Sequence, residues 1–294
     1  MKYIYFFISC FVLMASGAGA QDNILLPERF YVKKGEAIKV HLINVSQFIK
    51  QDEVSLDPNK FQKFTLGVGK KAEDLVPGLK APDTTTTIKF EKEGLNLLAV
   101  TMKVVNDDIE RDDFTKILDD EGLNDLSNKV KNGSKDNFRE RYTWYMKSLI
   151  KVDDKTNAND FEKSTGQDFE ITLKDNPYKG GYGDDITASV MFKGEPAVNA
   201  VVLFYIKTAD GNVFVQHMNA DKQGLIYFKL SREGTYMLRS MHMEASKDKS
   251  ADYDAWLATY TFAFSNTTDV PNSYKSFGIG NPPGGGRTGG GGRH

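Results

Sequence analysis

The chain has 294 residues, of which 40 % are hydrophobic and 12 % aromatic, with a formal net charge of −2. A near-neutral balance gives no electrostatic basis for nucleic-acid binding, which favours a basic surface. The only cysteine is Cys10, and no apolar run beyond the N-terminus is long enough to cross a bilayer, so neither a disulfide framework nor a later membrane anchor is expected.

The first twenty residues predict a cleavable signal peptide. Lys2 precedes an apolar run over 3–14, and small residues end the segment at Ala18-Gly19-Ala20. A basic start, an apolar stretch and an A-x-A-like end are the three parts of a secretory signal. A membrane anchor would need about 20 apolar residues. We therefore expect cleavage after Ala20, a mature chain beginning at Gln21, and a periplasmic or secreted protein.

The residues that follow predict a β-sandwich domain over 21–110. Ile38, Val40 and Leu42 alternate with Lys39 and His41. This period of two is typical of a half-buried strand and places the His41 side chain toward solvent. Further strands are expected over 61–68, 84–90 and 95–105, separated by Gly- or Pro-containing breaks.

The pattern then changes to a helical period, which predicts a two-helix insertion over 111–152. The first helix is expected over 112–130. A second is expected over 136–150, because apolar residues recur there at helical spacing: Phe138, Tyr142, Tyr145, Met146 and Leu149.

A polar linker over 153–167 leads into a second β-rich region over 168–265. About seven short strands with turn signals every 8–12 residues indicate an immunoglobulin-like sandwich. The tail over 266–294 is rich in Gly and poor in apolar residues, so we expect it to be disordered. The sequence thus predicts an all-β protein: two immunoglobulin-like β-sandwich domains with a two-helix insertion between them.

Catalytic residue sets are hard to assemble, so we expect no enzyme. Histidine, the usual general base near neutral pH, occurs only at positions 41, 217, 242 and 294. No G-x-S-x-G or H-E-x-x-H motif occurs, and the mature chain would lack a cysteine nucleophile.

The strand expected around Tyr236–Glu244 carries the most informative residues. Alternation places His242 and Glu244 on one face, with Met237, Met241 and Met243 on the other. His242 and Glu244, with His41, are the candidate metal ligands, and the methionines could serve a soft ion. The alternative is that His242 is a hydrogen-bonded strand residue and that the methionines fill gaps in a core.

Several short blocks resemble a known family in order and spacing. They include Phe192-Lys193-Gly194-Glu195-Pro196, the segments 220–224 and 233–236, Met241-His242-Met243 and the segment 254–262. Together they resemble the periplasmic family called domain of unknown function 4198, whose members are described as nickel- or cobalt-uptake components. The resemblance implies a nickel or cobalt ion as ligand.

Members of that family carry a His just after the signal peptide, which the resemblance implies is a metal ligand. The corresponding segment here, 21–27, contains no His, whereas His242 matches a family position. The first hypothesis is therefore an exported binding or accessory protein linked to nickel or cobalt uptake. The alternative is a non-enzymatic immunoglobulin-like module that binds a glycan or an envelope protein.

Overall fold

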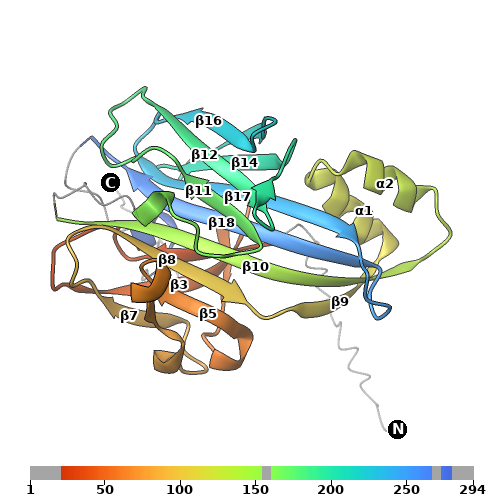
Figure 1. The fold of residues 1–294 in the computed structure, drawn as a ribbon, viewed down its shortest axis with the longest axis horizontal. Coiled ribbons are helices and arrows are strands. Elements are labelled where there is room, and N and C mark those ends of the chain that lie inside the picture. The colour runs from red at the N-terminus through yellow and green to blue at the C-terminus, as the bar shows by residue number, and fades with distance from the viewer. Residues whose placement is uncertain (1–20, 154–159, 267–272, 280–294) are drawn as a thin grey trace, which may run out of the picture.

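A computed structural model describes residues 21–153, 160–266 and 273–279. The predicted signal peptide lies outside these residues. The described part is mostly β-sheet, in sandwich-like layers with three α-helices, which confirms the predicted fold class (Figure 1). The outer sheets contain β1 (Asp22–Pro27), β3 (Ala37–Ser46), β4 (Ile49–Glu53) and β7 (Thr85–Lys89) in one, and β11 (Phe169–Leu173), β12 (Asp185–Phe192), β13 (Glu195–Pro196) and β16 (Leu225–Lys229) in the other.

The third sheet is larger and draws strands from both halves of the chain. The described residues give it ten strands: β2 (Tyr31–Val32), β5 (Phe61–Leu66), β6 (Glu73–Asp74), β8 (Gly94–Met102), β9 (Val105–Glu110), β10 (Asn137–Val152), β14 (Val201–Lys207), β15 (Val213–Asn219), β17 (Gly234–Ala245) and β18 (Tyr253–Phe264). Its main order is β15-β14-β17-β18-β10-β8-β5-β6. The β10–β18 pair is parallel, and it joins the two halves through nine register pairs from Glu140↔Tyr253 to Ser148↔Thr261.

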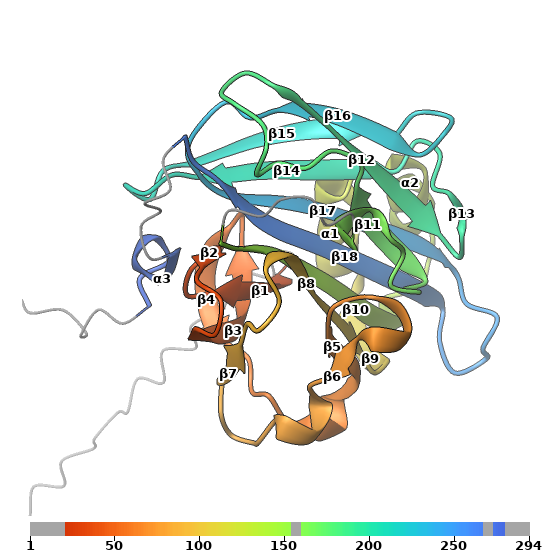
Figure 2. The same cartoon turned by 60° about the vertical axis from the view of Figure 1, so that its left-hand side comes forward.

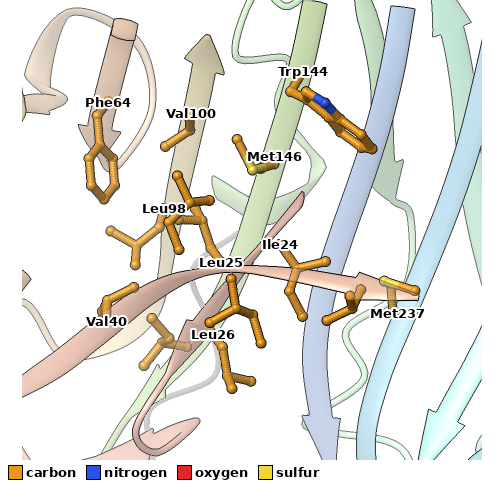
Figure 3. Close-up of a cluster of buried hydrophobic side chains, with 14 of the residues drawn as sticks. Ile24, Leu25, Leu26, Val40, Phe64, Leu98, Val100, Trp144, Met146 and Met237 are labelled. Carbon is orange, nitrogen blue, oxygen red and sulfur yellow. The ribbon is translucent and has the colours of Figure 1, made fainter. Parts of the chain in front are cut away.

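This central sheet has an outer sheet on each side (Figures 1 and 2). One core lies between it and the sheet of β1, β3, β4 and β7, and contains Trp144, Met146 and Met237. Figure 3 shows β1 crossing the central strands, with Ile24, Leu25 and Leu26 in this core. The other core lies against the sheet of β11, β12 and β16. Each fully buried aliphatic or aromatic side chain contributes about 1.5–3 kcal/mol through removal of apolar surface from water.

The predicted helix over 136–150 is wrong, because these residues form the long central strand β10. Residues 143–150 are all buried. Met146 lies in the first core, whereas Tyr145 and Leu149 lie in the second. A strand buried on both faces is apolar on both faces, so its residues happened to match a helical spacing.

Two helices do lie between β9 and β10, but both fall within the range predicted for the first one. They are α1 (Arg111–Asp120) and α2 (Asn124–Lys131). Between them Gly122 adopts a φ of +70°, a conformation that favours glycine, so the first helix ends before it. Phe114 and Leu118 of α1 pack against Phe138 and Tyr253 at one end of the long central strands.

The prediction of disorder over 266–294 is wrong for residues 273–279. Ser273–Ser276 form a short helix, α3, and Tyr274 and Phe277 are buried against the first core. The segments 267–272 and 280–294 lie outside the described residues. The remaining short elements are 3₁₀ turns: η1 (Pro58–Lys60), η2 (Gly69–Lys71), η3 (Val76–Gly78) and η4 (Asp160–Glu162).

The prediction that His41 faces solvent is also wrong, because residues 273–279 cover that face of β3. Its side chain is buried, and its ring meets the Tyr274 ring edge-on with centroids 4.5 Å apart. Residues 273–279 therefore cover a sheet face that the alternation on β3 alone marks as solvent-exposed.

Candidate functional site

His242 and Glu244 lie on one face of β17, as the sequence predicts. His242 Nε2 is 3.9 Å from a Glu244 carboxylate oxygen. Burial lowers the pKa of His242, and Glu244 opposes that effect only in part, so the imidazole is neutral near pH 7. A neutral imidazole beside a carboxylate is a competent pair of metal ligands but not a complete site.

His41 has a different set of neighbours on β3. Its Nδ1 is 3.3 Å from Glu53, and its ring packs against Tyr274. Within 21–153, 160–266 and 273–279, no group of three His, Cys, Asp or Glu residues is placed to hold a metal ion. The structure therefore does not bring His41 together with His242 and Glu244. Met237 and Met241 lie in the first core, on the opposite face of β17 from His242.

A cluster of three buried charged side chains lies at the start of β1. The Arg239 guanidinium donates to Asp22 through Nε at 2.6 Å and to both carboxylate oxygens of Glu121, which follows α1. All three side chains are at most 4 % exposed. Two carboxyl groups share one guanidinium, and burial raises the pKa of both, an effect that the Arg239 charge opposes.

A small cavity of about 200 Å³ opens on one side of this cluster. Its walls come from β1, β3, β9, β10, α1, β17 and β18, and thus from both halves of the chain. The lining residues are Gln21, Asn23, Asn44, Asp107, Ile109, Ile117, Glu121, Glu140, Tyr142, Trp144, Arg239, Met241 and Leu257. We call it the Glu140 pocket, because it contains the buried carboxyl of Glu140.

Glu140 is only 6 % exposed, and its side chain lines the pocket. In the sheet it lies directly opposite Asp107, a like charge. Burial, then the charges of Asp107 and Glu121, raise the pKa of Glu140 to about 7. Like charges directly opposite one another in a sheet destabilise it. A buried carboxyl left in this state marks a functional site candidate.

The side-chain oxygen of Asn44 in the Glu140 pocket lacks a hydrogen-bond donor. Asn44 donates through Nδ2 to Asn23 Oδ1 at 3.4 Å, whereas its own buried Oδ1 accepts no hydrogen bond within the described chain. The Glu140 carboxyl and this free Asn44 oxygen line one cavity. This arrangement would be satisfied by a cation.

Sequence reasoning missed Glu140 because the helix assignment hid it. Had 136–150 been taken as a strand, alternation would have placed Phe138, Glu140, Tyr142 and Trp144 on one face. A single carboxylate among three aromatic residues on one strand face would then have been a signal.

A family comparison matches residues 18–244 to the model described as domain of unknown function (DUF4198). The chain belongs to the DUF4198 family. The match covers every lining residue of the Glu140 pocket except Leu257, and it also includes His242 and Glu244. Among curated proteins, none matches this DUF4198 chain.

Solved structures resemble the DUF4198 chain only remotely. A tetra-tandem repeat from the extending region of a large adhesion protein aligns over 84 % of the chain, at 11 % identity with a TM-score of 0.23. The chain spans 50 % of that protein's length. The D0-D1 domain of intimin aligns over 83 % of the chain and 99 % of its own length, at 12 % identity and a TM-score of 0.20. The FN1-FN3 domains of chicken CNTN1 cover 84 % of this chain and 66 % of their own, at 10 % identity and a TM-score of 0.22.

No helix in the described part of the DUF4198 chain is long and apolar enough to cross a membrane.

Proposed function

We propose that the protein is an exported, non-enzymatic binding protein whose ligand is a divalent metal cation held in the Glu140 pocket. The observation that carries this proposal is the Glu140 carboxyl, which is 6 % exposed and lies opposite the like charge of Asp107. A bound cation would compensate both carboxylates and accept the free Asn44 oxygen as a ligand.

The donor set bears on which metal binds. Carboxylate and amide oxygens suit hard ions such as manganese and calcium, whereas nickel and cobalt prefer some nitrogen ligands. Gln21 lines the pocket, and cleavage after Ala20 would place a free α-amine there. That amine would take the place of the absent N-terminal histidine. We therefore extend the proposal to nickel or cobalt uptake, which requires cleavage after Ala20.

Calorimetric titration of the protein beginning at Gln21 with nickel, cobalt, manganese and calcium tests the proposal. We expect micromolar binding of at least one ion. Glu140→Gln should weaken that binding at least tenfold, because it removes the charge that the ion compensates. Asp108→Asn, at an exposed position of β9 next to Asp107, is the matched control and should bind as the wild type does.

Two results would contradict the proposal: no binding of any of the four ions, or equal affinity for wild type and Glu140→Gln. His242→Ala separates the two candidate sites. Loss of binding in that variant, with Glu140→Gln unaffected, would move the metal site to His242 and Glu244. Tighter binding of nickel or cobalt than of calcium would support a role in nickel or cobalt uptake.

The second candidate is an immunoglobulin-like module that binds another envelope component. It is favoured by β15, an edge strand of the central sheet on which Val215 is 54 % exposed and Phe214 39 % exposed. Exposed apolar edge strands accept further strands from partners. This candidate becomes the leading one if the titration shows no ion binding.

A further inference from the structure

An aromatic cluster lies on the face of the central sheet opposite the Glu140 pocket. His242 and Trp256 are register partners on β17 and β18, and Phe192 at the end of β12 lies across from them. Ring centroids are 4.0 Å apart for Phe192 and His242, and 4.9 Å for Phe192 and Trp256. The neighbouring residues Met241 and Leu257 line the Glu140 pocket, so alternation separates the two sites by the thickness of the sheet.

The cluster already holds a cation. The Lys193 ammonium lies 4.5 Å from the ring centroid of Phe192 and 4.5 Å from that of Trp256. It also donates to Glu244 at 3.5 Å. Two aromatic faces and one carboxylate around an ammonium group form the arrangement by which proteins bind organic ammonium ligands.

Lys193 is a weakly held occupant. It begins the tight turn between β12 and β13, where Lys193 and Gly194 both have positive φ. Its side chain is 48 % exposed and that of Glu244 is 40 % exposed. An ion pair this exposed contributes little to stability, so the Lys193 side chain can leave the cluster at small cost.

A polar atom at the base of the cluster is unsatisfied. His242 Nε2 is buried and finds no hydrogen-bond partner in the described chain, although Glu244 lies 3.9 Å away. Purely structural buried imidazoles are normally hydrogen-bonded on such an atom. The two rings and the Glu244 carboxylate surround the Lys193 ammonium, and the free His242 nitrogen lies 3.9 Å from that same carboxylate.

We propose that Phe192, Trp256, His242 and Glu244 form a binding site for the ammonium group of a small organic cation, and that Lys193 occupies this site until the ligand displaces it. The site is separate from the Glu140 pocket and does not depend on metal binding there.

Titration with tetramethylammonium, followed by tryptophan fluorescence and by line broadening of the ligand's methyl resonance, tests the site. Lys193→Ala should bind the probe about fivefold more tightly than the wild type, because the competing ammonium is gone. Lys174→Ala removes another exposed lysine after the neighbouring strand and should leave the affinity unchanged. Adding Glu244→Gln to Lys193→Ala should weaken binding again, and this exposed substitution does not endanger folding.

Methylammonium is the second probe, because it donates hydrogen bonds whereas tetramethylammonium cannot. A preference for methylammonium that disappears in Glu244→Gln would assign that carboxylate its role. The proposal is overturned if Lys193→Ala shows no saturable broadening of either probe, or if Lys193→Ala and Lys174→Ala bind alike.

Discussion

Single residues in this protein matter most where a charge is buried without full compensation. Arg239 satisfies Asp22 and Glu121, so each of these carboxylates has a partner although both are almost fully buried. Glu140 lines the pocket beside them and lies opposite a like charge, Asp107. Because burial raises the pKa of Glu140, its ionisation makes the free energy of unfolding depend on pH. A stability measurement can therefore detect it.

Glu140→Gln should stabilise the metal-free protein at alkaline pH. The folded pKa is raised from 4.5 to about 7, so between these values the folded state holds a proton that the unfolded state has lost. Stability therefore falls as the pH rises from about 4.5 to 7, by about 3 kcal/mol at 1.36 kcal/mol per pKa unit. Glutamine cannot ionise and avoids this loss.

Urea denaturation at pH 5 and pH 8 measures the effect. We expect the two proteins to be nearly equal at pH 5, with Glu140→Gln more stable at pH 8. A stability difference that is the same at both pH values would show that the Glu140 carboxyl does not titrate in this range.

At the scale of elements, the short helix α3 and the residue that follows it pack against the first core. Tyr274 and Phe277 lie in the first core, and Tyr274 donates through its hydroxyl to the Lys39 carbonyl of β3 at 2.7 Å. The Phe277 ring also packs edge-on against Phe48, with centroids 5.1 Å apart. The short segment 273–277, late in the chain, thus completes a sheet face formed by residues near its start.

Phe277→Ala should destabilise the protein by about 3 kcal/mol, because it leaves a cavity against Phe48. Lys275→Ala, an exposed substitution in the same helix, should change stability by less than about 0.5 kcal/mol. Chemical denaturation of both variants gives the comparison. Equal stability of Phe277→Ala and wild type would show that α3 does not pack on the core in solution.

For the whole molecule, the shared central sheet couples the two cores. Met146 and Leu149 belong to the same strand but lie in different cores. The parallel pairing of β10 with β18 joins residues more than a hundred positions apart. Disruption of either core therefore exposes a face of the sheet on which the other core depends.

We expect a single thermal unfolding transition, in which Met146→Ala and Leu149→Ala each lower the midpoint of the whole transition. Calorimetry distinguishes this from independent unfolding, since two-state behaviour requires equal calorimetric and van't Hoff enthalpies. Lys151→Ala, at a half-buried position of the same strand, serves as the milder comparison. Two resolved transitions, each sensitive to only one of the core variants, would contradict this coupling.

The sequence by itself determined the β-rich class, the turn positions and the faces of β17, because alternation and turn residues act over a few neighbouring positions. It placed His242 and Glu244 together for the same reason. Only the tertiary structure decided that 137–152 is a strand, because burial of both its faces depends on two outer sheets from distant parts of the chain. The Glu140 pocket could not be predicted from local sequence pattern, because its walls come from seven elements. Glu140 meets the charges of Asp107 and Glu121 only once these elements are assembled.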